Sequence, residues 1–550
     1  MAIRRLHQIS LLTLVVSLGT VAASAQSFRV QCPTSTITHP VAANNNAEPA
    51  YTGPSYTGQT STPTGTVNGA IKCQQISGGD GYSTMADGTQ TFMFSFGPLS
   101  GIADIAAGKP GTQFPSVFNT TAPVLPVPGD PATTDDASTP GAYTYNGAIG
   151  LMGDEAVFVA DSHVPPQNAC VTQNPPPAAC ITGHVDPRQI MDVGVMNGNI
   201  PAPLMAIDED DEFFLTLTNV GMIMRPDLFE QHTVHFHGYP NASSFYDGVP
   251  DASVAINIGA SFTYYYLAPD AGTYFWHCHI TPPEHLQMGM VGQIYVRPRQ
   301  DRVPSTTTLY AALQAQQTDL RTACNSATDI LCSNPLPAVN TGAMGAATIP
   351  KGGTSGYAYN DGDGSTYYDV EYPLQIHGFD PNFHFVGMTF NPEGFADMKD
   401  KYFLLNGRSY PDTIQAGPLE TESSDGRKHF SQPLPSIINI PAGGKALLRI
   451  SDLDVSEYQT LASLGIPMKV IGYNAKLLRD QSGNNLYYNT NSITLAGGES
   501  LDVILDASTL KADGSSYKAG EVYYLYTPNL DHLANDAENF GGLMTEVHIN

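Results

Sequence analysis

Two short histidine-rich segments constrain this chain more than any other feature. The first is HTVHFHG, from His232 to Gly238, and the second is HCHITPPEHLQMGM, from His277 to Met290. Together they hold six of the fifteen histidines in the chain, and the second segment also holds a cysteine flanked by two histidines. So many ligating side chains in so little sequence predict a metal centre.

The types of side chain favour copper. A thiolate, two imidazoles and a weakly bound thioether form the blue, or type-1, copper site that transfers electrons. His232, Cys278, His285 and Met290 supply this set. Two other interpretations stay open: cysteine and paired histidines also build structural zinc sites, and histidines two residues apart on a strand are commonly not ligands.

The four other histidines form two pairs, each with a spacing of two residues. His235 and His237 form one pair, and His277 and His279 form the other. Side chains two apart on a strand point to the same side, so each pair can reach one metal region while Cys278 points the other way. The spacing therefore predicts a second copper site joined to the first through one strand.

This order of motifs resembles the C-terminal copper-binding repeat of multicopper oxidases, the laccase and cuproxidase superfamily built from cupredoxin domains. NGNIPAP, YFLLNGRSYPDT and GGESLDVILD are similar to other segments of these proteins, so the resemblance covers about residues 191–550. It implies an all-β fold of two cupredoxin-like Greek-key β-sandwich or barrel domains with an N-terminal extension. It also implies type-1 copper, together with type-2 or type-3 copper or both. In this sequence the copper motifs lie in the first domain alone.

The chain departs from the family pattern in the loop after the HCH motif. Five residues, Ile280 to Glu284, separate this motif from His285, where the family usually has three. In length, this loop is intermediate between the usual loop of the family and that of copper nitrite reductases, which is longer still. The geometry of the type-1 site is therefore less fixed by the resemblance than its ligands are.

The second site also departs from the family. A complete trinuclear copper site takes eight histidines from two domains, but no pair spaced by two residues follows His279. His377 and His532 are the best remaining candidates for additional ligands. Either the second site is smaller than trinuclear, or another subunit contributes ligands, as the trimers of two-domain family members imply.

Residue patterns divide the chain into five parts. Strand-like alternation begins near Thr89, and Ser261 to His279 is expected to form two strands around a Pro-Asp-Ala-Gly turn. We expect a signal peptide (1–25), an extended arm (26–84), a copper-binding domain with insertions (85–298), a linker containing one short helix (299–364) and a second, copper-free domain (365–550).

The N-terminus and the cysteines both predict a periplasmic or secreted protein. Arg4 and Arg5, the apolar run that follows and a small-residue site ending at Ala25 are typical of a cleaved signal peptide. Without Cys278, six cysteines remain, an even number that suits disulfides outside the cytoplasm. Proximity in sequence suggests the pairs Cys32–Cys73, Cys170–Cys180 and Cys324–Cys332.

Composition excludes some partners. A net charge of −27 disfavours nucleic acid and anionic membranes. The apolar run of the signal peptide is too short for a membrane span, and no other stretch is long and apolar enough. The expected partners are O₂ and an electron donor, either a small reducing substrate such as a phenol or metal ion, or a redox protein. A homotrimer would agree with the resemblance.

Three functions fit these observations. The first is an extracytoplasmic multicopper-oxidase-like oxidoreductase that passes electrons from a reducing substrate through type-1 copper to a second copper site, where O₂ is reduced. The second is a nitrite-reductase-like enzyme with one type-2 copper. The third is a non-catalytic protein that carries electrons or binds copper. The number of copper ions per chain separates these functions.

Overall fold

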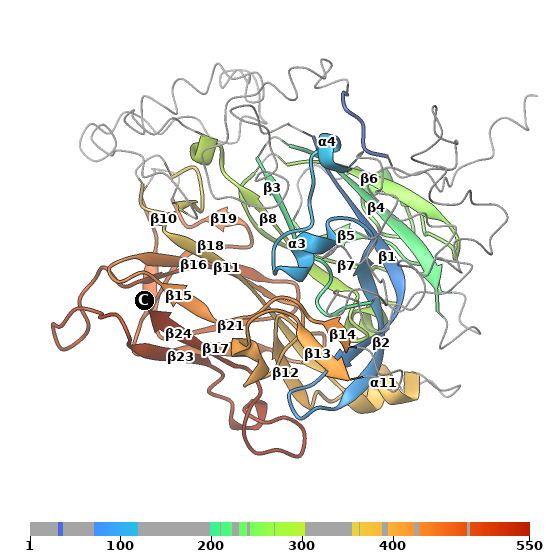
Figure 1. Ribbon diagram of the computed structural model, residues 1–550. Coiled ribbons are helices and arrows are strands. Elements are labelled where there is room, and N and C mark those ends of the chain that lie inside the picture. Colours follow the sequence, from blue (N-terminus) through green and yellow to red (C-terminus); the bar gives the residue numbers. More distant parts are fainter. Residues whose placement is uncertain are drawn as a thin grey trace, which may run out of the picture.

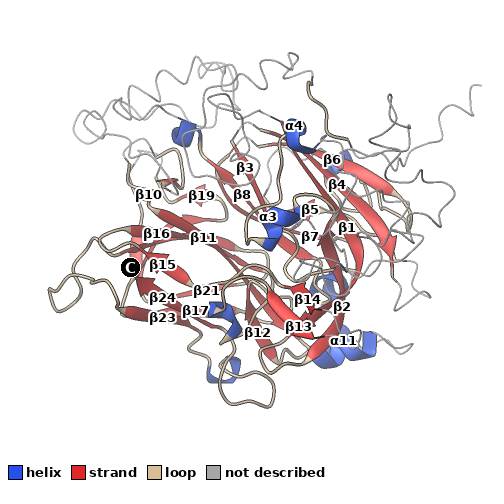
Figure 2. Ribbon diagram, in the orientation of Figure 1, coloured by secondary structure: helices blue, strands red, loops and turns tan. Residues whose placement is uncertain are grey.

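Strands are the main regular secondary structure of the described residues, and the helices among them are short (Figures 1 and 2). The computed structural model describes residues 31–36, 71–118, 198–209, 211–222, 230–238, 243–268, 270–302, 355–361, 364–387, 394–422, 428–480 and 484–550. The predicted signal peptide, the linker helix and the pairs Cys170–Cys180 and Cys324–Cys332 lie outside the described residues. Within them, no helix has the length and apolarity that a membrane crossing needs.

The first half of the described structure, residues 71–302, is a sandwich of two four-stranded sheets. One sheet has the order β2-β1-β4-β6 and the other the order β3-β8-β7-β5. The strands are β1 (Ile71–Thr84), β2 (Gln90–Pro98), β3 (Met205–Asp208), β4 (Glu212–Gly221), β5 (His235–Phe236), β6 (Ser261–Leu267), β7 (Gly272–His277) and β8 (Val291–Arg297). The helices are α3 (Ile102–Ala106), α4 (Pro115–Phe118) and α9 (Pro282–Gln287).

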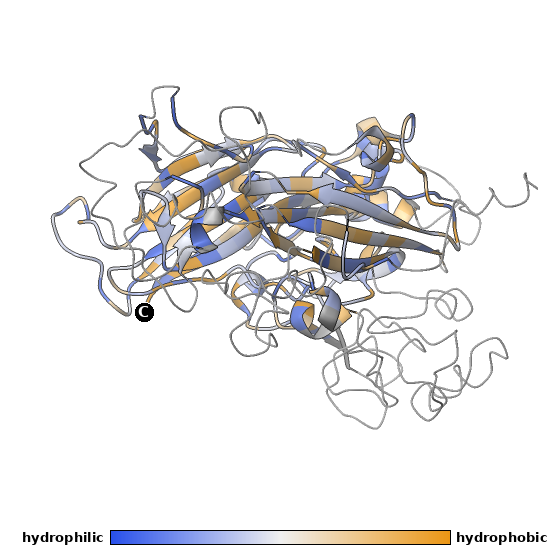
Figure 3. Ribbon diagram, turned by 90° about the horizontal axis from the view of Figure 1, so that it is seen from above, coloured by the Kyte–Doolittle hydropathy of each residue, from blue (hydrophilic) through white to orange (hydrophobic). Residues whose placement is uncertain are grey.

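The core of this sandwich forms because apolar side chains alternate along its strands. Phe92, Phe94 and Phe96 of β2 all point inward, as do Tyr264 and Tyr266 of β6, since residues two apart share a face of a sheet. Figure 3 shows this alternation as orange and blue residues along the strands. The same core contains Cys278 and Met290, so the predicted type-1 ligands lie at one end of the packed interior.

The second half, residues 355–550, contains two larger sheets. Their orders are β12-β11-β16-β22-β18-β19, with β20 beside β18, and β15-β24-β23-β17-β21. The strands are β11 (Val370–Phe379), β12 (Tyr402–Leu405), β15 (Ile438–Ile440), β16 (Lys445–Asp452), β17 (Gln459–Leu464), β18 (Met468–Tyr473), β19 (Lys476–Leu477), β20 (Tyr488–Thr490), β21 (Ser492–Leu495), β22 (Ser500–Asp506), β23 (Val522–Tyr526) and β24 (Met544–Ile549). Two small hairpins, β9 (Gly356–Tyr357) with β10 (Tyr367–Tyr368) and β13 (Leu419–Glu422) with β14 (Lys428–Ser431), and one helix, α11 (Pro381–Gly387), complete it.

The two halves share one topology. The order β2-β1-β4-β6 matches β12-β11-β16-β22, and β3-β8-β7-β5 matches β15-β24-β23-β17. The parallel pairs also agree: β1 with β4 matches β11 with β16, and β3 with β8 matches β15 with β24. The predicted all-β fold of two cupredoxin-like sandwiches is confirmed.

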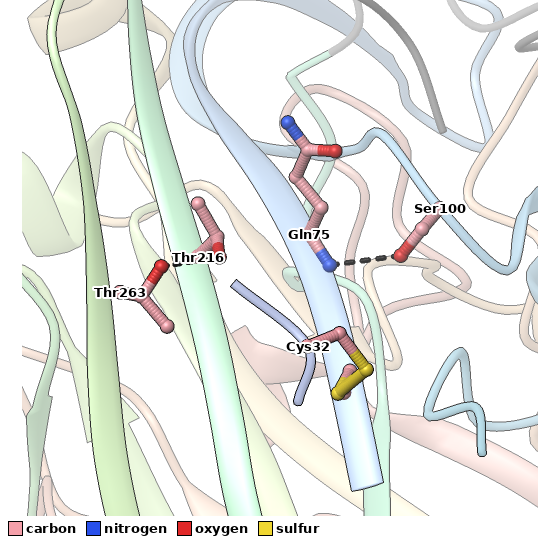
Figure 4. Close-up of a disulfide and its surroundings, with 6 residues drawn as sticks. Cys32, Gln75, Ser100, Thr216 and Thr263 are labelled. Atoms are coloured by element: carbon pink, nitrogen blue, oxygen red, sulfur yellow. Dashed lines mark hydrogen bonds between the residues drawn. A yellow bond between two sulfur atoms is a disulfide. The ribbon is translucent and has the colours of Figure 1, made fainter. Parts of the chain in front are cut away.

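The predicted extended arm is wrong at its C-terminal end. Residues Ile71–Thr84 form β1, which pairs with β2 and β4 in the middle of a sheet. Its sequence, IKCQQISGGDGYST, hides this role because buried polar residues and glycines interrupt the apolar alternation. The predicted disulfide between Cys32 and Cys73 is present and ties the arm to this strand (Figure 4).

Polar contacts join the two halves over a broad interface. Glu371 of β11 forms ion pairs with Arg297 of β8 and Arg449 of β16. Thr273 of β7 donates a hydrogen bond to Asp502 of β22 at 2.6 Å. These groups are buried, so each charge needs its partner. The interface therefore fixes how the second half lies against β7, the strand that leads to Cys278.

Candidate metal centres

The first candidate centre joins three of the predicted type-1 ligands. One ligand atom from each of His232, Cys278 and His285 lies within 4.8 Å of the others, and all three residues are buried. His232 is held by backbone hydrogen bonds with Ile256, Cys278 directly follows β7, and His285 lies in α9. The segment between the HCH motif and His285 is longer than is usual in the family. Its last three residues, from Pro282 to Glu284, form the start of α9.

The thiol and one imidazole of this centre stabilise each other's charged forms. His285 Nδ1 lies 3.3 Å from Cys278 Sγ. Burial opposes ionisation of both groups, but the charge and hydrogen bond of His285 outweigh it and lower the pKa of Cys278. Cys278 in turn raises the pKa of His285 to about 9 against the effect of burial. A thiolate is the form of cysteine that binds metal.

The second imidazole has no polar partner of its own. Both ring nitrogens of His232 are buried and lack a hydrogen-bond acceptor or donor within the described structure. Burial, followed by the charge of His285, keeps the pKa of His232 well below its usual value, so the ring is neutral and offers a lone pair. Buried polar atoms without partners are rare, and a metal ion beside Cys278 would satisfy one of them.

Met290 completes the predicted set at the same end of the core. It is fully buried in the hydrophobic cluster that also contains Cys278. Its carbonyl accepts a hydrogen bond from Cys278 N at 3.1 Å, and its own N–H donates to His285 O at 2.8 Å. Gly289, with φ of +114°, provides the turn that brings Met290 back to the cysteine. All four residues fit a type-1 copper ion.

Three of the four paired histidines form a second cluster. Ligand atoms of His235, His237 and His277 lie within 4.8 Å of one another. Two of the rings are oriented by a backbone carbonyl: Nδ1 of His235 lies 2.6 Å from Asp247 O, and Nδ1 of His277 lies 2.7 Å from Cys278 O. Gly498 lies against the third ring, that of His237. Such bonds from Nδ1 to a carbonyl fix the tautomer that leaves Nε2 free for a metal.

The closest contact in this cluster fits a bound cation. His237 Nε2 and His277 Nε2 lie 2.9 Å apart. Burial, with a smaller contribution from His235, lowers the pKa of His237 to about 4, and burial also lowers that of His277 well below its usual value. Two neutral rings that each donate from Nδ1 would direct lone pairs at each other, so a metal ion resolves the contact.

His279 lies at the edge of this cluster. Its ring centroid is 5.1 Å from that of His235 and 5.4 Å from that of His277. It is not part of the group of converging ligand atoms, and its backbone N–H donates to Thr233 Oγ1 at 2.9 Å. The structure therefore places His279 beside the second site but brings only the other three predicted ligands together.

The two additional candidate ligands belong to neither cluster. His377 Nε2 is 3.1 Å from the carbonyl of Leu286. His532 has partners on both ring nitrogens, Gln459 at 3.1 Å and Glu457 at 3.0 Å. Within the described residues, neither histidine joins a group of possible metal ligands. The structure does not bring either residue together with the three histidines of the second cluster, and each contacts a different local structure.

His532 instead occupies the position of His285 in the second half. In the loop after β23, Leu543 N donates to His532 O at 3.1 Å, just as Met290 N donates to His285 O in the loop after β7. The nearby glutamates also correspond. Glu457 contacts the ring of His532 and precedes β17 in the same way that Glu230 contacts His285 and precedes β5.

The other positions of this equivalent site carry residues that do not bind copper. Strand pairing sets Ala462 opposite Tyr526, where the first half has His235 opposite His277. Counting from these pairs, Gln459 stands in the place of His232 and Thr527 in the place of Cys278. The shared topology thus shows that residues other than histidine occupy the positions where a second pair of histidines, two residues apart, was expected.

Sequence reasoning missed three residues that shape the sites. Glu230 is 28% exposed and lies 3.6 Å from His285 Nε2, which makes it the polar group between this ring and solvent. Asp247 and Gly498 hold His235 and His237. Glu230 precedes the first motif closely enough to have been considered, but nothing in the sequence links Gly498 to a histidine over 260 residues away.

Comparison with known proteins agrees with this geometry. The profile of the family described as multicopper oxidase matches residues 181–301. Residues 181–301 thus resemble a multicopper oxidase domain. The matched segment contains all eight residues predicted to bind copper in the two sites, from His232 to Met290, and the matched family implies copper as the cofactor.

The relatives found by sequence each match about a quarter of this chain or less. Laccase abr2 of Aspergillus fumigatus is 33% identical over 109 residues, which are 20% of this chain and 17% of the laccase. Multicopper oxidase MmcO of Mycobacterium tuberculosis is 30% identical over 139 residues, 25% of each chain. The copper-containing nitrite reductase of Rhizobium meliloti is 35% identical over 109 residues, 19% of this chain and 26% of the reductase. The matches thus span about a quarter or less of each relative.

Solved structures give distant likenesses over a longer stretch. A blue copper oxidase from Nitrosomonas europaea is 20% identical, with a TM-score of 0.41 over 64% of this chain and 78% of that protein. A copper nitrite reductase from the same organism is 15% identical, with a TM-score of 0.36 over 64% of this chain and 85% of that protein.

Proposed function

We propose that the protein is an extracytoplasmic, multicopper-oxidase-like oxidoreductase that takes electrons singly from a reducing substrate and delivers them to O₂. His232, Cys278, His285 and Met290 would hold type-1 copper. His235, His237 and His277, with His279 beside them, would hold type-2 or type-3 copper or both. Bound copper would supply the one-electron chemistry and the reduction of O₂ that these side chains cannot perform.

One observation carries the proposal: His277 and Cys278 are consecutive residues that belong to different clusters. The hydrogen bond between the His277 ring and the Cys278 carbonyl, 2.7 Å long, adds a second connection across the same peptide. The path between the two clusters is therefore short and rigid. A structural zinc site would use Cys278 but would leave the second histidine cluster without a role.

The surroundings of the sites support the direction of electron flow. The type-1 residues are buried, and the 28% exposed Glu230 beside His285 is the polar group through which a donor would approach this ring. We propose a small phenol, a reducing metal ion or a redox protein as donor. The net charge of −27 favours a cationic donor over an anionic one, and a signal-like N-terminus with the Cys32–Cys73 disulfide supports a periplasmic or secreted location.

Nitrite reduction is a second candidate, because three imidazoles, rather than four or more, converge in the second cluster. A three-histidine site suits a single copper ion. It would also agree with a trimer in which another subunit completes the site.

Metal content and turnover together test the proposal. The copper-loaded protein should be blue, contain more than one copper ion per chain and consume O₂ with a phenol or a reducing metal ion. Nitrite consumption without O₂ consumption would select the second candidate. One copper ion per chain and no turnover of either acceptor would indicate a non-catalytic electron carrier.

A further inference from the structure

The segment that connects two of the type-1 ligands is held by the other half of the protein. We call residues 285–290, from His285 to Met290, the ligand loop. Within the first half, Met290 N donates to His285 O and Cys278 N donates to Met290 O, and Ser95 Oγ of β2 donates to Gly289 O. The two residues after His285 are Leu286 and Gln287. Their backbone carbonyls and the side chain of Gln287 face the second half.

Gln287 makes the most extensive of these contacts. The residue is fully buried, and its side-chain amide donates to Asp400 Oδ1 at 3.0 Å. Its side-chain carbonyl accepts a hydrogen bond from Asp380 N at 3.1 Å. Both ends of the amide are thus bound to the second half. Because an unpartnered buried amide costs more than a hydrogen bond returns, this side chain resists moving away from either group.

Two buried histidines of the second half contact the backbone of the same loop. His384 Nε2 lies 2.8 Å from Gln287 O, and His377 Nε2 lies 3.1 Å from Leu286 O. The other ring nitrogen of His384 lies 2.6 Å from Phe92 O, and a neutral imidazole donates to one carbonyl at a time. His384 therefore lies between β2 and the ligand loop.

The helix that carries His384 is built into the first half. Phe383, its neighbour in α11, belongs to the hydrophobic cluster that contains Cys278 and Met290. Figure 1 shows α11 beside β2. Moving the ligand loop would therefore disturb apolar packing as well as hydrogen bonds.

We propose that Gln287, clamped by Asp400, Asp380 and His384, is a positioning residue that sets the geometry of the type-1 copper ligands from the copper-free half of the protein. The proposal rests on the proposed function only in assuming that copper binds these ligands. Residues that orient metal ligands commonly change metal affinity 10–100-fold when replaced. The second half would then be required for the properties of a copper ion to which it contributes no ligand.

A matched pair of substitutions tests this role. Gln287→Met keeps the length of the side chain but removes its hydrogen bonds. Gln293→Met does the same at a second buried glutamine, which donates to Arg449 O and Ser451 Oγ across the interface between the halves but lies outside the ligand loop. We expect Gln287→Met to weaken type-1 copper binding about 10–100-fold in competition with a Cu(I) chelator, and to shift both the midpoint potential and the EPR signal. Gln293→Met should leave all three at the parent values.

Hydrogen exchange in the parent protein tests the clamp without a mutation. In the metal-free protein, amides of residues 285–290 should exchange as slowly as those of β8, because the second half holds the loop before copper binds. Exchange as fast as in the exposed turn at residues 513–515 would overturn the proposal. So would a folded Gln287→Met variant with the parent's copper affinity, potential and EPR signal. A parent protein that binds copper without blue colour would count instead against the proposed function.

Discussion

His277 and Cys278 are neighbours in sequence, yet their side chains enter two different clusters of metal ligands. The thiolate lies 3.3 Å from His285 Nδ1, while His277 Nε2 lies 2.9 Å from His237 Nε2. Strand geometry produces this division because successive side chains point to opposite sides. One peptide unit therefore joins a buried Cys/His/Met site to a three-histidine site.

The colour of the protein should depend on Cys278. Replacing Cys278 by serine removes the thiolate whose bond to copper gives the blue absorption, so we expect the visible band to disappear from the copper-loaded protein. Thr527→Ser is the matched control, since Thr527 holds the same position in the second half, and it should leave the band unchanged. Blue colour that survives Cys278→Ser would show that the type-1 ligands are assigned incorrectly.

The second cluster should be needed for turnover but not for colour. The double substitution His235→Ala with His237→Ala removes two of its three converging imidazoles and leaves the type-1 ligands intact. We expect the blue absorption to remain and O₂ consumption to fall to the level of the metal-free protein. His548→Ala, which alters a partly exposed histidine paired with Glu546, should change neither. Parent-like O₂ consumption in the double variant would refute the two-site scheme.

The correspondence between the halves predicts that a second blue site can be built. Gln459→His, Thr527→Cys and Leu543→Met would restore, around His532, the residue types present in the first half. In a Cys278→Ser background, where the original site is silent, we expect this triple variant to regain thiolate-to-copper absorption. The same background with Gln459→His and Leu543→Met alone should stay colourless. A folded triple variant that binds copper without this absorption would contradict the correspondence.

A buried carboxyl group should make stability depend on pH. Asp452 is fully buried, its Oδ2 has no hydrogen-bond partner in the described structure, and burial together with Asp454 holds the pKa of Asp452 well above its usual value. The folded state then keeps a proton on Asp452 that the unfolded state releases. Asp452 therefore makes the protein less stable as the pH rises above the pKa that its carboxyl group has in the unfolded chain.

Asp452→Asn removes this dependence. We expect a higher thermal midpoint than that of the parent at pH 7, and little difference near pH 4, when the two metal-free proteins are compared by circular dichroism. Asp531→Asn, at an exposed position, should have no effect at either pH. A lower midpoint for Asp452→Asn at pH 7 would mean that the aspartate is stabilising in its charged form.

The sequence was sufficient to predict that His232, Cys278 and His285 lie together, because each residue type suits one role in a metal site and the spacing follows the pleat of a strand. The strands Ser261–Leu267 and Gly272–His277 were predicted for the same reason. β1 was missed because its buried side chains are glutamine, serine and lysine as well as isoleucine, so no apolar alternation marks it.

Contacts between segments that are distant in the chain could not be predicted from the sequence. Nothing near Gly498 indicates that it orients His237, and a single buried histidine such as His384 gives no sign of its partners. His532 was suggested as an additional ligand because isolated histidines are ambiguous. The shared topology and the backbone hydrogen bonds were needed to show that His532 occupies, in the second half, the position that His285 has in the first.

Anomalous diffraction at the copper absorption edge tests the central claim most directly. Crystals of the copper-loaded protein should give one anomalous peak among His232, Cys278 and His285, and at least one more among His235, His237 and His277. A single peak, or a metal at the cysteine whose absorption edge is that of zinc, would contradict a two-site copper oxidoreductase.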